Sequence, residues 1–205
     1  MNDDRALVFS RIREALASRP ERAEAPEYAN DVAVARAALA GSDLVATFVT
    51  RLERVRGRAF TTLEALSAWL RERGALRGYV DPVLRSFVAS GFDADFRIET
   101  EFSRARIDDY DFGITRAVAA IAETGTLVLD DARTSSRLAA LAPWIHVAVV
   151  RRTEFHRHVA SAIAALGTDP SVIWVTGPSK TADVEGILIE GVHGPGEQVA
   201  LILDG

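Results

Sequence analysis

The segment from Ser171 to Gly196 places polar and charged side chains between two apolar runs. Val172–Val175 has the length and the β-branched and aromatic content of a strand, as does Ile187–Ile189, so we expect two buried strands. Open α/β sheets hold their ligands where strands end, and the first run ends at a turn. We therefore expect a ligand-binding site made by the following residues: Thr176, Gly177, Ser179, Lys180, Thr181, Asp183, Glu185 and His193.

Lys180 makes an anion the favoured ligand. If a short helix begins at Ser179, the amides of its first turn lack partners and its positive end attracts an anion. The segment is not the phosphate loop of a nucleoside triphosphatase, because Ser179 stands where that loop needs a glycine before the lysine, and Pro178 has no N–H. The alternative is that Lys180 pairs with its own acidic neighbours on a solvated turn.

A second candidate lies at the bend between two short apolar strands within residues 119–129. Glu123 is a carboxylate at this bend, and if burial raises its pKa it could act as a general base on a 2-hydroxy acid. We expect Thr124, Gly125 and Thr126 to line the same cleft as the 176–185 segment. The alternative is that Glu123 accepts backbone N–H bonds and holds the bend.

Histidine is the other residue type that could act chemically, and the chain has four. His193 lies in a glycine-rich turn that could present its imidazole to a ligand. His156 and His158 are two residues apart on an expected helix, so they point in different directions and make a poor metal pair. His146 begins an expected buried strand and is interpreted as structural. No spacing of His, Asp and Glu is typical of a metal site, so we expect no bound metal.

Composition limits the class of protein. With 205 residues and 48% apolar content, the chain can bury a full core. Its net charge of -5 gives no reason to expect binding to nucleic acid or to an anionic membrane. Without a signal peptide or an apolar run approaching the ~18 residues of a membrane span, we expect a cytoplasmic protein.

The chain has no cysteine, so it can neither form a disulfide nor ligate an iron–sulfur cluster through thiolates. It also lacks the GxGxxG fingerprint of dinucleotide-binding folds, and we expect it to carry no cofactor. Lys180 is the only lysine, since 23 of the 24 basic residues are arginine. That bias is equally well explained by a selected lysine or by the base composition of the genome.

Alternating helix and strand patterns predict an α/β fold of Rossmann-like type, a mostly parallel sheet with helices on both faces. Residues 1–30 are expected to form an N-terminal helical arm and a Pro-containing linker, and residues 31–205 the α/β domain. Trp69, Trp144 and Trp174 are expected in the core. The expected helices are 43–55, 62–73, 82–89, 134–141 and 153–166; the expected strands are 58–60, 79–80, 95–100, 106–109, 145–150, 171–176, 187–190 and 199–203, with the folded pair at 119–129.

The segment Ser171–Gly196, taken together with Ala122–Leu129, resembles the lactate-utilisation family, whose core is the LUD domain. The short amphipathic helix around Phe9–Leu16 is similar to that family too, and the resemblance is strong from about Asp111 onward. It implies a bacterial cytoplasmic component of a system that oxidises L-lactate to pyruvate beside iron–sulfur partner proteins. It also implies a fold akin to the sugar-phosphate isomerase and CoA-transferase superfamily.

Three functions compete at this point. The resemblance implies an accessory or anion-binding subunit without its own redox centre. A stand-alone enzyme would act on a hydroxy acid, a sugar phosphate or a CoA ester, and class I CoA-transferases use a glutamate in a pattern to which Glu123-Thr124-Gly125 is similar. A scaffold without a ligand is the third, and the density of polar groups in the loops argues against it.

Overall fold

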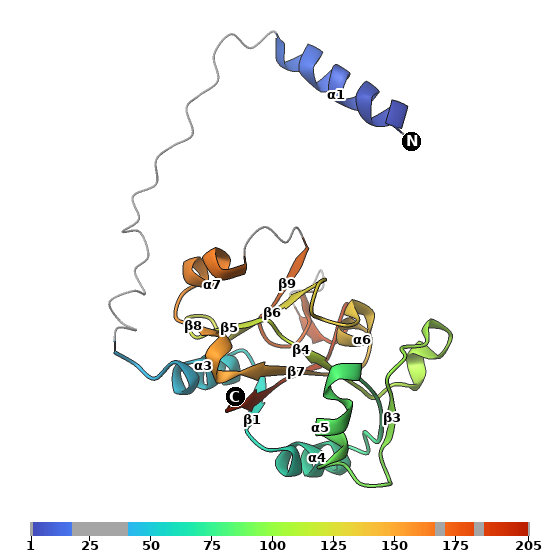
Figure 1. Ribbon diagram of the computed structural model, residues 1–205, viewed down its shortest axis with the longest axis vertical. Helices are drawn as coiled ribbons and strands as arrows, with labels where there is room; N and C mark the ends of the chain where they lie inside the picture. Colours follow the sequence, from blue (N-terminus) through green and yellow to red (C-terminus); the bar gives the residue numbers. More distant parts are fainter. Residues whose placement is uncertain (1, 18–40, 167–170, 183–186, 205) are drawn as a thin grey trace. The chain divides into compact units, whose positions relative to one another are not determined.

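The protein is described by a computed structural model that places residues 2–17, 41–166, 171–182 and 187–204. The chain divides into two units, Met1–Val34 and Ala35–Gly205. In the first unit, helix α1 (Asn2–Ala17) lies within residues 1–30, where the helical arm was predicted. All other elements belong to the second unit (Figure 1).

The second unit is built on a six-stranded sheet in the order β1-β12-β7-β4-β2-β3, in which every strand pair is parallel (Figure 1). Parallel strands covered on both faces read as near-continuous apolar runs, which is the pattern of the central strands here. The fold class predicted from sequence is confirmed. The strands are β1 (Arg58–Phe60), β2 (Arg77–Val80), β3 (Arg97–Glu99), β4 (Phe112–Arg116), β7 (Ile145–Arg151) and β12 (Glu197–Leu203).

Two cores lie on the two faces of this sheet. Alternate side chains of β7 show the division, because Val147 and Val149 belong to one core while Ala148 and Val150 belong to the other. The first core contains α4 (Leu63–Glu72) and α5 (Arg85–Ala89), and the second contains α3 (Leu44–Arg54) and a smaller sheet. Helix α6 (Arg137–Leu141) lies in the connection that leads to β7, and the 3-10 turn η2 (Pro82–Leu84) lies between β2 and α5.

The smaller sheet has four strands in the order β8-β5-β6-β9. Strands β5 (Ala119–Ile121) and β6 (Thr126–Asp130) are antiparallel and fold back between residues 122 and 125, as predicted. Strand β9 (Val172–Val175) extends the sheet beyond β6, and β8 (Phe155–His156) lies beside β5. Helix α7 (Val159–Leu166) packs on it through Ala162.

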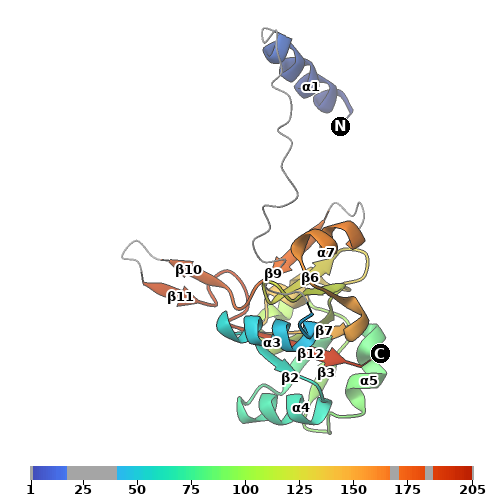
Figure 2. The same ribbon diagram turned by 90° about the vertical axis from the view of Figure 1, so that its left-hand side faces the viewer.

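A two-stranded hairpin of β10 (Lys180–Ala182) and β11 (Leu188–Glu190) projects from the body of this unit (Figure 2). The prediction of a buried strand over 187–190 is therefore wrong about burial, because Leu188 is 52% exposed. Strand β9 was also expected to be buried, yet Trp174 is 37% exposed because β9 is an outer strand of its sheet.

Other local predictions also differ from the structure. Residues 106–109 are not a strand but part of the 3-10 segment η3 (Arg104–Asp109), since Arg106 and Tyr110 both turn back to bind Glu99. The helix expected over 153–166 starts only at Val159. Before it, η4 (Arg152–Glu154) and β8 carry Phe155 into the core against the ring of Phe48.

The three tryptophans differ in burial. Trp69 is in the core as expected, but Trp144 is 54% exposed. Its ring covers Gly191 and Gly196, where an added Cβ would lie 2.3 and 2.2 Å from ring atoms. Trp144 thus closes the glycine-rich turn before β12. None of the helices within the described ranges is long and apolar enough to span a membrane.

Candidate functional site

A chain of three hydroxyl groups joins the two segments that the sequence singled out. The Oγ1 of Thr124 lies 2.7 Å from that of Thr126, which lies 2.7 Å from that of Thr176. Thr126 begins β6 and Thr176 follows β9, so the antiparallel pairing of these strands brings the two segments together. The structure therefore places Thr124, Thr126 and Thr176 side by side.

Two glycines in these segments lie against helix α3. Gly125 has φ +68° and an added Cβ would lie 2.4 Å from the backbone nitrogen of Leu52. Gly177 has φ +79°, and its Cβ would lie 2.5 Å from the carbonyl oxygen of Val55. Only glycine combines positive φ with so close an approach of backbone to backbone. Both segments are thus anchored on the C-terminal half of α3.

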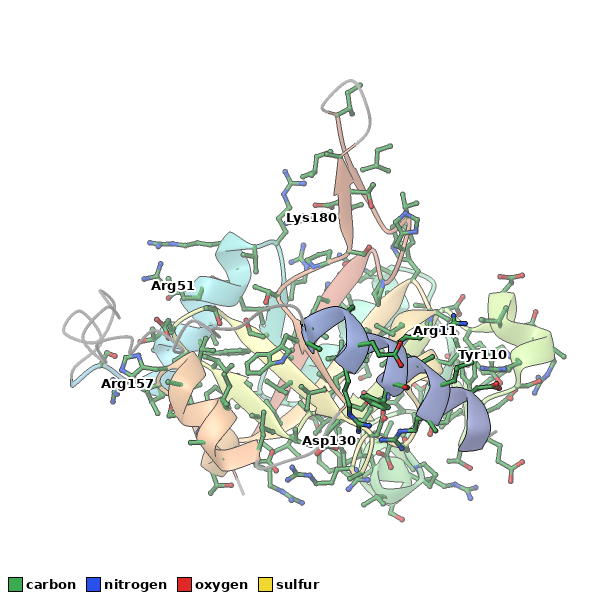
Figure 3. The ribbon with its side chains drawn as sticks, turned by 90° about the horizontal axis from the view of Figure 1, so that it is seen from above. Arg11, Arg51, Tyr110, Asp130, Arg157 and Lys180 are labelled. Atoms are coloured by element: carbon green, nitrogen blue, oxygen red, sulfur yellow. The ribbon has the colours of Figure 1, made fainter. Side chains whose placement is uncertain are left out.

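Lys180 binds the end of the same helix. Its Nζ donates a hydrogen bond to the carbonyl oxygen of Val55 at 3.0 Å and lies 4.0 Å from a carboxylate oxygen of Glu190. A cation is favourable at the negative C-terminal end of a helix, where carbonyl groups lack partners. No helix begins at Ser179, because β10 follows it directly and runs into the hairpin (Figure 3). These partners, Val55 and Glu190, are not the neighbouring acidic residues of the alternative prediction, since Asp183 and Glu185 lie outside the described residues.

Glu123 contacts the N-terminal end of a helix, whereas Lys180 contacts a C-terminal end. Its Oε2 accepts a hydrogen bond from the backbone N–H of Val159 at 3.0 Å, at the first residue of α7, and lies 3.6 Å from Nδ1 of His158. A carboxylate is favourable at the positive N-terminal end of a helix. This contact corresponds to the alternative in which Glu123 accepts a backbone N–H, although the bond stabilises α7 as well as the bend.

The remaining predicted residues surround the base of the hairpin. Ser179 holds the glycine-rich turn, because its N–H donates to the carbonyl oxygen of Pro195 and its carbonyl oxygen accepts from the N–H of Gly191. Thr181 pairs with Ile189 across the hairpin, and His193 is exposed on the turn. Asp183 and Glu185 lie outside the described residues.

An open cavity of about 760 Å³ adjoins this region at the amino ends of β1 and β12. Charged residues line it, and most of them are paired: Arg56 binds Glu190 at 2.9 Å, and Arg73 binds Glu197 at 2.9 Å. These pairs connect the hairpin and β12 to the segments after α3 and α4. The lining roles of Arg56 and Arg73 are structural, since each already has a carboxylate partner.

A second cavity, of about 640 Å³, lies at the opposite edge, where β1, β4, β7 and β12 end. Arg116 lines it, and its Nε donates to Oδ2 of Asp81 at 2.8 Å. The residues that line this cavity were not predicted from the sequence. Asp81 directly follows β2 and Arg116 ends β4, so the detectable signal was an ionisable residue at the carboxyl end of each of two neighbouring strands.

Two further ionisable groups have strongly shifted pKa values. Burial lowers the pKa of His146 to about 4, and its ring nitrogens lie 2.9 Å from Thr115 Oγ1 and 2.9 Å from Gln198 Oε1. Hydrogen bonds from Arg106 and Arg77 lower the pKa of Glu99 to about 2. His146 is structural, as predicted. Among the residues that the structure describes, no group of three His, Cys, Asp or Glu side chains could hold a metal ion.

Comparison with known families gives one family match, since the model described as the LUD domain matches residues 19–203. A relative from Deinococcus radiodurans, named lactate utilization protein C, is 31% identical over 152 residues, which cover 68% of this chain and 70% of the relative. Relatives of the same name from Bacillus subtilis and Bacillus licheniformis are 35% and 33% identical, and this chain spans 45% of the length of each.

A solved structure with a similar fold is the crystal structure of a DUF162 family protein from Deinococcus radiodurans. It superposes with a TM-score of 0.54 at 21% identity and covers 78% of this chain and 96% of that one. At this level of identity the likeness is one of fold, and it agrees with the parallel sheet described above.

Proposed function

Because this chain belongs to the LUD-domain family, we propose that it is a component of a bacterial L-lactate utilisation system. The observation that carries the proposal is the extent of the family match, which runs over residues 19–203 and so includes both sheets. The three relatives named lactate utilization protein C that are described above share from 31% to 35% of the aligned residues with it. In this role the chain would contribute to the oxidation of L-lactate to pyruvate in the cytoplasm.

Iron–sulfur proteins are the proposed partners. A two-electron oxidation needs an electron acceptor, and this chain has no cysteine with which to bind a cluster through thiolates. The electrons would therefore pass through other subunits. The chain itself would act as an accessory or anion-binding subunit, with Glu123 to Thr126 and Thr176 to His193 as the candidate binding segments.

The experiment is deletion and complementation in the native host. Deleting the gene should abolish growth on L-lactate and leave growth on glucose unchanged, and the full chain supplied in trans should restore it. Affinity purification of the complementing chain should recover iron-containing proteins and L-lactate oxidation together. Normal growth of the deletion strain on L-lactate would refute the proposed function.

The alternative, an enzyme that uses Glu123 as a base or nucleophile on an anionic small molecule, is favoured by one observation. Only Oε2 of Glu123 has a hydrogen bond or ion contact among the described residues, and the side chain is 23% exposed. Oε1 is thus open to a substrate. Growth of the Glu123→Gln variant on L-lactate separates the two functions, because an accessory subunit needs the helix contact and not the charge.

A further inference from the structure

The cavity at the carboxyl ends of the main sheet has the position of a ligand site. In open parallel α/β sheets, ligands bind outside the carboxyl ends of the strands. Four of the six parallel strands contribute residues to this cavity or lead directly into it: Thr61 after β1, Arg116 of β4, Val149 of β7 and Leu203 of β12. Its volume of about 640 Å³ lies within the range of small-molecule pockets, which is roughly 300 to 1,000 Å³.

Arg116 is the charged residue of this cavity whose position is fixed by a buried carboxylate, that of Asp81. Asp81 is fully buried, and its two carboxylate oxygens are both used, since Oδ1 accepts from the N–H of Val83 at 2.9 Å and Oδ2 from Nε of Arg116 at 2.8 Å. The Arg116 side chain is 32% exposed. The only side-chain hydrogen bond of Arg116 to a residue that the structure describes uses Nε, and its two terminal nitrogens make none. They form a fixed fork, which is the geometry that binds a carboxylate or a phosphate through two parallel bonds.

Other polar groups complete this side of the cavity. Arg151 lines it without an ion pair to any described residue, and hydroxyl groups come from Thr61, Thr62 and Ser90. Three carboxylates also stand in the lining: Asp204 is paired with Arg152, Glu154 accepts the backbone N–H of Arg151, and Glu64 lies on the exposed first turn of α4. Because these charges oppose long-range attraction, binding would depend on direct contact with Arg116.

The remaining wall is apolar. Val83 and Phe87 from the segment after β2, and Leu203 at the end of β12, line the cavity, and Val83 is 69% exposed. Apolar side chains and a guanidinium that line the same cavity suit a ligand with one charged end and one apolar end. The volume exceeds what an anion of three carbon atoms would fill.

We propose that this cavity binds an amphipathic organic anion, with its carboxylate or phosphate on the Arg116 fork and its apolar chain against Val83, Phe87 and Leu203. This site is separate from the Glu123 and Lys180 segments, and the proposal does not depend on the role in lactate utilisation.

Anilinonaphthalene sulfonate, a fluorescent aromatic anion, is the probe for the test. The full chain should bind it saturably, and 2-hydroxy acids of increasing length should displace it with an affinity that rises about fourfold per methylene group. Octyl phosphate in a parallel titration shows whether the fork prefers a carboxylate or a phosphate. Equal displacement by L-lactate and 2-hydroxyoctanoate would refute the proposal.

Two variants locate the binding. Val83→Asp places a carboxylate in the cavity at an exposed position, so it should weaken binding by at least about tenfold without unfolding the chain. Leu188→Asp makes the same change on the exposed hairpin and should leave binding unchanged. If Leu188→Asp removes the probe and Val83→Asp does not, the probe binds the hairpin and the proposal is wrong.

The contribution of the arginine is tested by the double variant Asp81→Asn with Arg116→Gln, which removes both charges and leaves no buried carboxylate unpaired. Its affinity for 2-hydroxyoctanoate should fall at least about tenfold, while circular dichroism confirms the fold. Unchanged affinity in a folded double variant would refute the proposal. If the double variant does not fold, the pair Val83→Asp and Leu188→Asp decides.

Discussion

The Nζ of Lys180 donates a hydrogen bond to the carbonyl oxygen of Val55 at 3.0 Å, so the only lysine of the chain closes the C-terminal end of α3. Since Gly177 also lies against Val55, the helix end and the segment after β9 hold each other in place. The charge of Lys180 has a structural partner whether or not a ligand also binds there.

Replacing Lys180 by methionine should lower the free energy of unfolding by about 1 kcal/mol, because the hydrogen bond and the favourable charge at the helix end are both lost. Urea unfolding at neutral pH measures the change. Arg54→Met is the matched control, since it removes a cation from the last turn of the same helix without removing the bond to Val55. An equal loss in both variants would mean that the hydrogen bond contributes nothing.

Glu123→Gln keeps a carbonyl oxygen for the N–H of Val159 but removes the charge. We expect its free energy of unfolding to fall by no more than about 1 kcal/mol, whereas Glu123→Ala should lose that much or more because the amide of α7 loses its acceptor. Thermal unfolding compares the two. If Glu123 acts as the base or nucleophile of an enzyme, Glu123→Gln also slows growth on L-lactate, and an unaffected growth rate would leave Glu123 with the helix contact alone.

Gly125→Ala should be among the most damaging single changes in the chain. The added Cβ would lie 2.4 Å from the Leu52 nitrogen at a residue with φ +68°, so we expect a loss above about 3 kcal/mol. Gly74→Ala is the control, because Gly74 has φ +69° with no atom within 4 Å of the added Cβ and should cost only about 1 kcal/mol. Equal costs at the two positions would show that the contact with α3 is not tight.

Acid should destabilise the protein first through His146. Burial lowers the pKa of His146 to about 4, below the roughly 6.5 of an unfolded chain. The unfolded chain therefore takes up a proton at higher pH than the folded protein does. Stability from the neutral ring is complete above about pH 6.5 and is lost as the pH falls towards 4, by an amount on the order of 3 kcal/mol.

Comparing His146→Gln with the parent protein isolates this effect, because glutamine can still bind Thr115 or Gln198 but does not titrate. The variant should lose the slope of stability against pH in that window, measured by urea unfolding. Loss through Glu99, whose pKa is lowered from 4.5 to about 2, sets in only as the pH falls below about 4.5. An identical slope in parent and variant above about pH 4.5 would contradict the assignment.

Periodicity and chain order predicted five of the six strands of the main sheet, and missed β4 (Phe112–Arg116), in whose place a strand was expected at 106–109. Asp43 and Thr62 were the detectable helix starts, and their side chains do accept the first backbone N–H groups of α3 and α4. The fold of β5 and β6 at Thr124-Gly125 was also correct, since the glycine there requires positive φ.

Burial could not be predicted as well. Ile187–Ile189 is as apolar as a core strand, yet it lies in a hairpin with only one partner, and sequence alone does not show how many neighbours a strand will have. The polar residues around Lys180 and Glu123 suggested a ligand, but which helix ends lie within their reach depends on packing. Asp81 and Arg116 were overlooked because two single charges at strand ends form no local motif.

Strand β12 lies between β1 and β7 in the main sheet, although it is the last of the six to be synthesised. During translation, β1 and β7 emerge before the strand that joins them, so each has an unpaired edge that can pair wrongly with other strands. Closure of the β1–β12 pair also spans most of the domain sequence, which slows folding. A nonsense mutation before Glu197 would therefore not only shorten the domain but also leave β1 without its partner strand.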